Sequence, residues 1–173
     1  MNPVRRPNDT DLSSVRLRPT PEADLPFVLG LEADPETAPF IHPWPVDDHR
    51  NAMSDSTAAH WIVEELQPVG FVILRTVDTD VVELKRIAIS GKGEGYGRHA
   101  LRLVKRTVFD DWGARRLWLD VYDFNARARS LYQAEGFVAE STRPASEACG
   151  PGAEGTAIIM ALEKSSPHVS PRG

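Results

Sequence analysis

Residues 90–100, SGKGEGYGRHA, place four glycines at alternate positions between an apolar stretch and a segment with helical periodicity. The four are Gly91, Gly93, Gly95 and Gly97. Glycine carries an entropic cost inside or beside regular structure, so its accumulation at such a junction indicates that the backbone must approach another group closely. The fold and the function both depend on what that group is.

A strand, a glycine-rich turn and a helix N-terminus, in this order, form a binding site for an anion. The first backbone N–H groups of a helix lack internal partners, and the helix dipole favours negative charge there. Lys92 and Arg98 add positive charge beside the turn. A glycine cluster alone would suit a flexible surface turn, but the two cations and the position between strand and helix favour a phosphate site.

Composition limits the class of protein. The chain has 173 residues, 41% of them hydrophobic, which is enough for one domain with a sizeable core. The formal net charge of −5 argues against a nucleic-acid partner. The only cysteine, Cys149, excludes an intramolecular disulfide and a metal site with several cysteines. We therefore expect a cytoplasmic protein without a metal.

Polar, proline-bearing segments flank the predicted domain. We expect flexible tails over residues 1–14 and 165–173 and a single domain over residues 15–164. No run approaches the ~18 apolar residues that would span a bilayer, so we expect no membrane association.

Hydrophobic periodicity predicts the order β-α-loop-β-β-β-α-β-α-β-β. The predicted strands are residues 15–18, 59–65, 68–78, 81–90, 115–122, 137–141 and 156–163, and the predicted helices are residues 21–32, 95–112 and 125–135. Residues 34–55 are rich in proline and acid and are predicted to form a long loop with at most short helical turns. Strands that first form hairpins and then alternate with helices predict a mixed α/β sheet with helices packed on it.

Two known phosphate-binding motifs can be compared with the glycine stretch: one does not match, and the other matches in spacing but follows an unsuitable strand. A P-loop needs serine or threonine after Gly91-Lys92, where this chain has Gly93. Residues 95–100, GYGRHA, satisfy the dinucleotide fingerprint G-x-G-x-x-A, and Asp120 follows at about the expected ~20 residues. The charged residues 83–86, ELKR, do not suit the buried first strand of a parallel sheet. An oxidoreductase-type nucleotide domain nevertheless stays open as an alternative.

A third motif matches better. Residues 92–97, KGEGYG, resemble the Q/R-x-x-G-x-G/A pyrophosphate loop of the GNAT acetyltransferase superfamily, with lysine in place of the usual glutamine or arginine. Residues 83–90, ELKRIAIS, are similar to the family's central strand, and residues 117–137 to its next strand and helix. The likeness covers residues 58–140 well and residues 15–31 loosely. It implies an acetyl-CoA-dependent N-acetyltransferase with a mostly antiparallel sheet that splays at the cofactor site and carries helices on both faces.

The resemblance also implies how acetyl-CoA is held. The central strand and its neighbour would separate, often at a bulge, and the pantetheine arm would fill the gap like an added strand. A free N–H there would polarise the thioester carbonyl, and Asn125 would contact the arm while capping its helix. The residues assigned to acetyl-CoA are Ile87, Ala88, Ile89, Lys92, Gly93, Gly95, Tyr96, Gly97, Arg98 and Asn125.

For the chemistry, the resemblance implies direct attack by an amine, with no covalent acyl-enzyme, because Cys149 lies far along the chain from the motifs. Glu83 is the candidate general base; Asp120, His42 or a chain of waters are alternatives. Strict period-two alternation would put Glu83 on one face with Ile87 and Ile89. Lys85 would share that face, where it could instead hold Glu83 in a structural ion pair.

Tyr132 is the candidate general acid for the departing thiolate. It lies seven residues after Asn125, about two helical turns, so both side chains project from nearly one face. A phenol with a pKa of ~10 stays protonated at neutral pH and can donate. The alternative interpretation is a tyrosine packed on the sheet.

The acceptor amine is poorly specified by sequence. Acids and aromatic residues in the first helix and the loop after it suit a cationic amine: Asp34, Glu36, Phe40, His42, Trp44, Asp47 and Asp48. A protein N-terminus, an amino acid, a polyamine and an aminoglycoside all stay open. So do a homodimer and a CoA-binding module without catalytic activity.

Overall fold

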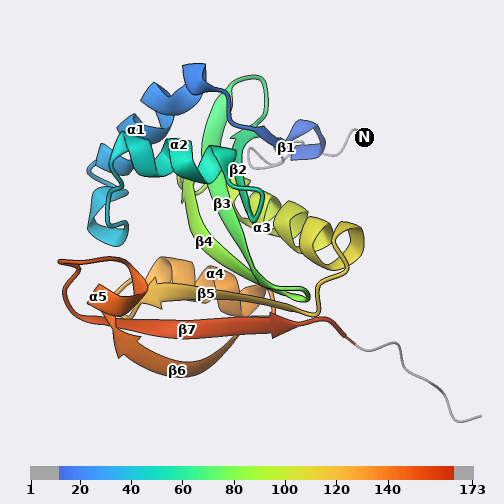
Figure 1. The fold of residues 1–173 in the computed structure, drawn as a ribbon, viewed down its shortest axis with the longest axis vertical. Coiled ribbons are helices and arrows are strands. Elements are labelled where there is room, and N and C mark those ends of the chain that lie inside the picture. The colour runs from blue at the N-terminus through green and yellow to red at the C-terminus, as the bar shows by residue number, and fades with distance from the viewer. Residues whose placement is uncertain (1–11, 166–173) are drawn as a thin grey trace, which may run out of the picture.

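The computed structural model describes residues 12–165, which form one seven-stranded sheet in the order β1-β2-β3-β4-β5-β7-β6 (Figure 1). All neighbouring strands pair antiparallel except β4 and β5, which are parallel. The strands are β1 (Arg16–Pro19), β2 (Ala58–Glu64), β3 (Pro68–Asp78), β4 (Val81–Ile89), β5 (Arg116–Tyr122), β6 (Val138–Pro144) and β7 (Thr156–Glu163). The predicted mixed sheet is confirmed, and the alternative of a doubly wound dinucleotide fold is wrong. The predicted tails lie outside the described residues, apart from a 3₁₀ turn at Leu12–Ser14 and residue 165, the last described position.

Helices cover both faces of the sheet (Figure 1). The apolar side chains of α3 and α4 belong to the larger core cluster on one face, and those of α1 to a second cluster on the other. The helices are α1 (Leu25–Ala33), α2 (Val46–Ser54), α3 (Tyr96–Arg106), α4 (Ala126–Ala134) and the short α5 (Ala145–Ala148), with 3₁₀ turns η2 (Glu22–Asp24) and η3 (Ala38–Phe40) and a π turn η4 (Thr107–Asp111). Periodicity over the predicted helix 95–112 places Leu101, Val104, Val108 and Trp112 on one apolar face. The first three are fully buried, in α3 and η4, whereas Trp112 is 41% exposed and does not belong to the buried face.

The prediction of a loop over residues 34–55 is wrong for its second half, which is α2. This helix begins after Pro45, and Asp47 and Asp48 in its first turn complement the helix dipole. Its one buried residue is His49. Periodicity could not indicate this helix, since its contact with the core is made by a polar side chain.

The parallel pair β4–β5 is short, and this positions the site. Residues 81–83 pair with residues 116–118, and no further pairing joins the two strands. Just beyond this point β4 contains a one-residue bulge: Ile73 of β3 lies opposite Arg86, and Leu74 lies opposite Leu84, which leaves Lys85 as the extra residue. The two strands diverge from there (Figure 1). The splayed sheet implied by the family resemblance is therefore present.

The bulge also reverses the alternation of side chains along β4. Leu84 before the bulge and Ile87 and Ile89 after it all pack into the cluster beneath α3 and α4. Glu83, next to Leu84, therefore points to the opposite face, where Ala88 joins the cluster beneath α1. The prediction that Glu83 shares a face with Ile87 and Ile89 is wrong, because strict period-two counting ignores the extra residue.

A buried polar chain fills the space between α1, α2 and the sheet. Arg86 Nη1 donates to Glu32 Oε1 at 2.6 Å, and Glu32 Oε2 lies 3.4 Å from His49 Nε2. His49 Nδ1 is 3.0 Å from His60 Nε2, and His60 Nδ1 is 2.8 Å from Thr20 Oγ1. All five residues are buried. Burial, reinforced by the nearby His49, lowers the pKa of His60 to about 4.

This chain predicts that the protein loses stability as pH falls from 7 to 5. In the unfolded chain a histidine takes up a proton near its ordinary pKa of about 6.5, whereas folded His60 resists protonation until about pH 4. The stabilisation is thus complete above pH 6.5 and lost progressively below it, by about 3 kcal/mol in total. Urea unfolding of His60→Gln should show lower stability at pH 7 and a weaker pH dependence. His99→Gln on α3 is the matched control, and equal slopes for wild type and His60→Gln would contradict the assignment.

Candidate active site

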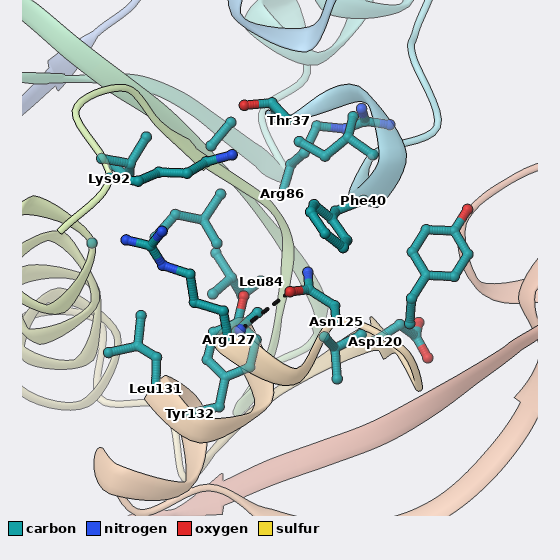
Figure 2. A pocket seen from close by; sticks show the side chains of 18 of the residues that line it. Thr37, Phe40, Leu84, Arg86, Lys92, Asp120, Asn125, Arg127, Leu131 and Tyr132 are labelled. Atoms are coloured by element: carbon teal, nitrogen blue, oxygen red, sulfur yellow. Dashed lines mark hydrogen bonds between the residues drawn. The ribbon is translucent and has the colours of Figure 1, made fainter. Parts of the chain in front are cut away.

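A cavity of about 880 Å³ occupies the gap where β4 leaves β5 (Figure 2). Its walls are the second half of β4, the glycine turn, the start of α4, the segment around η3 and the end of α5. Every residue that the sequence assigns to acetyl-CoA lines this cavity, and so do both predicted catalytic residues, Glu83 and Tyr132.

The glycine turn has the conformation that its composition indicates. Gly91, Gly93 and Gly95 have φ values of +61°, +99° and +88°, which residues other than glycine rarely adopt. Gly95 is the N-cap of α3, so the unpartnered N–H groups of the first helical turn follow it directly. Gly97 has ordinary φ, and a Cβ placed there would lie 3.6 Å from Leu131 Cδ2, at the cavity wall.

Three cations surround this end of the cavity: Lys92, Arg98 and Arg127. Figure 2 shows the Lys92 and Arg127 side chains extending toward the same part of it. Lys92 Nζ donates to the backbone carbonyl of Glu36 across the opening, and Arg98 Nε lies 3.5 Å from the carboxylate of Glu135. Arg127 is not among the residues predicted to bind acetyl-CoA, although its place two residues after the predicted cap Asn125 is a usable signal.

Tyr96 is part of the hydrophobic core, although the sequence assigns it to acetyl-CoA binding. Its ring packs into the core beneath α3, and its hydroxyl donates to Glu65 Oε2 at 3.0 Å. Any contact that Tyr96 makes with an anion at the helix N-terminus would therefore come from its backbone N–H.

Asn125 caps α4 as predicted. Its Oδ1 accepts from the backbone N–H of Ala128 at 3.2 Å, and the side-chain nitrogen points into the cavity (Figure 2). Across from it, the edge of β4 that faces β5 has no strand partner beyond residue 83 within the described part of the chain. An extended ligand between the two would meet a side-chain amide on one side and free backbone groups on the other.

Tyr132 lies at the bottom of the cavity, where its side chain rises from α4 toward Leu84 of β4 (Figure 2). It is only 7% exposed and belongs to the core cluster on the α3–α4 face. Burial raises its pKa above the ordinary value for a phenol, so the hydroxyl is a protonated donor at neutral pH.

The two candidate carboxylates are both buried and both paired. Glu83 Oε1 lies 3.4 Å from Lys85 Nζ, and its other oxygen lies 3.9 Å from Arg75. Asp120 accepts from Nε of Arg143 at 3.0 Å and from the Nη2 of the same guanidinium. The ion pair between Glu83 and Lys85 considered from sequence is therefore present, and it does not remove Glu83 from the cavity wall.

Cys149 lies much closer to the predicted motifs in space than its distance along the chain indicates. Cys149 directly follows α5 and lines the cavity beside Ala148. A Cβ on Gly150 would come within 3.0 Å of the His42 ring, which places His42 against this segment. Burial raises the pKa of the Cys149 thiol, which keeps it protonated and weakly nucleophilic.

Comparisons with known proteins agree with this geometry. The sequence profile of the "Acetyltransferase (GNAT) family" matches residues 25–137, more than half of the chain. The chain therefore belongs to the GNAT acetyltransferase family.

Curated relatives include uncharacterized N-acetyltransferases of Mycobacterium tuberculosis and Mycobacterium bovis, each 36% identical over 76 residues. The match covers 43% of this chain and 49% of each relative, so it spans about half the length of those proteins.

Solved structures with the same fold include the ribosomal-protein-S18-alanine N-acetyltransferase of Escherichia coli, with a TM-score of 0.71, 23% identity, and coverage of 92% of this chain and 99% of that one. The spermidine N-acetyltransferase of Vibrio cholerae in complex with CoA and spermine has a TM-score of 0.74 and 22% identity, with coverage of 87% and 96%. Within residues 12–165, no helix is long and apolar enough to cross a membrane, and no group of three or more His, Cys, Asp or Glu side chains is arranged to hold a metal ion.

The glycine turn gives a direct test of the binding site. Gly97→Val adds a branched side chain at the cavity wall without a positive φ to strain. We expect acetyl-CoA affinity to fall by about tenfold or more, equivalent to at least about 1.4 kcal/mol, in calorimetric titration of a folded protein. Gly30→Val on α1, where a Cβ meets nothing within 4 Å, is the control. Wild-type affinity in folded Gly97→Val would refute the placement of the pyrophosphate.

Proposed function

We propose that the protein transfers an acetyl group from acetyl-CoA to an amine by direct attack on the thioester, without a covalent acyl-enzyme. The observation that carries this proposal is the cavity at the splay, where an anion site, a free strand edge and a buried phenol lie along one continuous path. Acetyl-CoA offers a matching sequence of groups: pyrophosphate, amide-bearing arm and thioester.

The cosubstrate would lie with its pyrophosphate at the N-terminus of α3. Backbone N–H groups there and the side chains of Lys92, Arg98 and Arg127 supply positive charge. The pantetheine arm would run between α4 and β4, hydrogen-bonded to the side-chain amide of Asn125 and to the free edge of residues 87–89. An N–H of that edge would polarise the thioester carbonyl, as an oxyanion donor does.

The positions of Glu83 and Tyr132 suit the two proton transfers. Glu83 lies on the α1–α2 face of the splayed sheet, and Tyr132 belongs to the cluster on the α3–α4 face. With the thioester in the gap between them, the amine would approach from the side of Glu83 and lose its proton there. The thiolate would leave toward Tyr132 and take a proton from its hydroxyl.

A CoA-binding module without catalysis is the alternative that shares this fold. Release of free thiol from acetyl-CoA across a panel of amines separates the two functions, since a module would bind acetyl-CoA and release nothing. Titration with NAD is the matched negative control, because this mostly antiparallel sheet is not a doubly wound dinucleotide fold.

Tyr132→Phe tests the general acid. The variant keeps the ring packing and removes only the donor, so kcat should fall by roughly tenfold to a thousandfold, because thiolate is a fair leaving group. Acetyl-CoA affinity and Tm should change little. Wild-type turnover, with chemistry shown to be rate-limiting, would exclude Tyr132 as the acid.

Glu83→Gln tests the base. We expect the rate to fall by ~10²–10⁴, and the loss should shrink as pH rises, because more of the amine is then already neutral. Lys85→Met is the matched control: it breaks the ion pair but keeps the carboxylate. If both variants lose the same activity independently of pH, Glu83 has only a structural role, and Asp120 or His42 becomes the candidate.

A further inference from the structure

One wall of the cavity is a segment with little secondary structure of its own. Residues 36–42, between α1 and α2, contain only the 3₁₀ turn η3, and we call them the η3 segment. The cavity is lined by most of its side chains: Glu36, Thr37, Phe40, Ile41 and His42. The other acids and aromatic residues predicted to face an amine do not line the cavity: Asp34, Trp44, Asp47 and Asp48.

The η3 segment lies on the side from which the proposed reaction takes its amine. Ile41 packs against the cluster beneath α1, so the segment is on the same face of the sheet as Glu83. Figure 2 shows Thr37, Phe40 and Arg86 together on the side of the cavity away from Tyr132. An amine that approaches the thioester from this face passes along the segment, and the place of the segment therefore determines how the amine is held.

Glu32 joins the two ends of this stretch of chain. It lies in the last turn of α1, before the η3 segment, and its Oε2 accepts from the backbone N–H of Trp44, after the segment, at 3.1 Å. The contact closes a loop in which the two residues are 12 positions apart. A bond that closes a loop excludes most of the other conformations open to the residues within it.

The second oxygen of Glu32 connects the loop to β4. Oε1 accepts from Arg86 Nη1 at 2.6 Å, and Arg86 directly follows the bulge and lines the cavity. The Arg86 guanidinium also lies over the Trp44 ring, with 4.5 Å between Cζ and the ring centroid. One carboxylate thus holds α1, the end of the loop and β4 together. We call Glu32, Trp44 and Arg86 the clamp.

The clamp is also connected to α2. His49 Nε2 lies 3.4 Å from Glu32 Oε2 and donates to it, because a carboxylate only accepts. The His49 ring lies 5.4 Å from the Trp44 ring. Burial would raise the pKa of Glu32, but the hydrogen bond from His49 and the charge of Arg86 lower it overall, so the carboxylate is charged at neutral pH.

We propose that Glu32 is a positioning residue for the acceptor amine: through Trp44 and Arg86 it holds the η3 segment in place, without contact with either substrate. Glu32 is buried and does not line the cavity. The inference rests on the proposed acetyl transfer and adds a residue to it. The acetyl-CoA site is supported from the other face, where Ile87 and Ile89 pack with α3 and α4. Loss of the carboxylate therefore weakens the use of the amine and leaves acetyl-CoA binding intact.

Glu32→Gln tests the clamp in the full-length protein. The variant keeps the size of the side chain but removes the charge that holds Arg86. Activity is measured by thiol release with the most active of four probe amines: spermidine, kanamycin, phenylalanine and a peptide with a free N-terminal alanine. We expect kcat/KM for that amine to fall by about tenfold or more, through a rise in KM, while the calorimetric Kd of acetyl-CoA changes by less than about twofold. An unchanged KM, or an equal loss of acetyl-CoA affinity, would overturn the proposal.

A second measurement follows the η3 segment without turnover. Cys149 is the only cysteine of the chain and lines the cavity. A Cβ on the next residue, Gly150, would lie 3.0 Å from the ring of His42, so the segment lies against the chain that carries the thiol. Release of the segment in Glu32→Gln should speed the reaction of Cys149 with 5,5′-dithiobis(2-nitrobenzoate) severalfold. An unchanged rate would contradict the hold of Glu32 on the segment.

Val28→Ala is the matched control for stability. Val28 is fully buried in the same helix, and its truncation leaves the charges and hydrogen bonds of the clamp unchanged. We expect a lower Tm with wild-type amine kinetics and wild-type Cys149 reactivity. If Val28→Ala reproduces the effects of Glu32→Gln, a general loss of stability explains them and the proposal is wrong.

Trp44→Leu keeps the test decisive if Glu32→Gln does not fold. Trp44 is half-buried, and its replacement leaves the ion pair between Glu32 and Arg86 in place while it loosens the end of the loop. We expect the same rise in KM and the same faster reaction of Cys149, and wild-type values in the folded variant would overturn the proposal. If no probe amine releases thiol in the wild type although acetyl-CoA binds, acetyl transfer is refuted, and the Cys149 rates still decide whether Glu32 holds the η3 segment.

Discussion

The extra residue in β4 is the constraint on which the rest of the site depends. Lys85 breaks the register with β3 just after β4 ends its short pairing with β5. Because of this one residue, β4 bends away from its neighbour, exposes a strand edge and reverses its faces. The cavity and the opposed positions of Glu83 and Tyr132 follow from the same local change.

A bent strand with one free edge needs support from its faces. On the α3–α4 face, Ile87 and Ile89 pack into the cluster formed with these helices. On the α1–α2 face, the ion pair between Arg86 and Glu32 connects β4 to α1, and the backbone N–H of Trp44 donates to the same carboxylate at 3.1 Å. Buried ion pairs contribute little net stability, but removal of one partner is costly. The pair therefore fixes where α1 and the segment after it lie relative to the cavity.

Much of this arrangement could be predicted from sequence, because its signals are local. The alternate glycines indicate the turn at the start of α3, the cap at Asn125 indicates α4, and strand patterns indicate the order of the sheet. The helix at residues 46–54 could not be predicted, since its core contact is His49 rather than an apolar residue. The bulge was equally hidden: residues 81–89 are apolar or charged on both faces, so alternation gives no sign of where it shifts.

Contacts between residues far apart in the chain account for the remaining differences between the predicted site and the observed one. Cys149 lines the cavity because the chain at the end of α5 returns to it, and no spacing in the sequence indicates that return. The same applies to the carboxylate of Asp120 in β5, whose partner Arg143 comes from β6. A count of acids along the chain therefore overestimates the negative charge that a ligand would meet.

The short pairing between β4 and β5 also has a mechanical consequence. Within residues 12–165, three residue pairs are the only strand pairing between a unit built on β1–β4 and a unit built on β5–β7. The strands within each unit are joined by longer antiparallel pairings. Bending between the units would therefore concentrate at the short β4–β5 pairing, and α3 connects the two strands in the chain (Figure 1). A molecule bound between the diverged strands would contact both units far from the β4–β5 pairing. It would thereby limit the movement of the two units relative to each other.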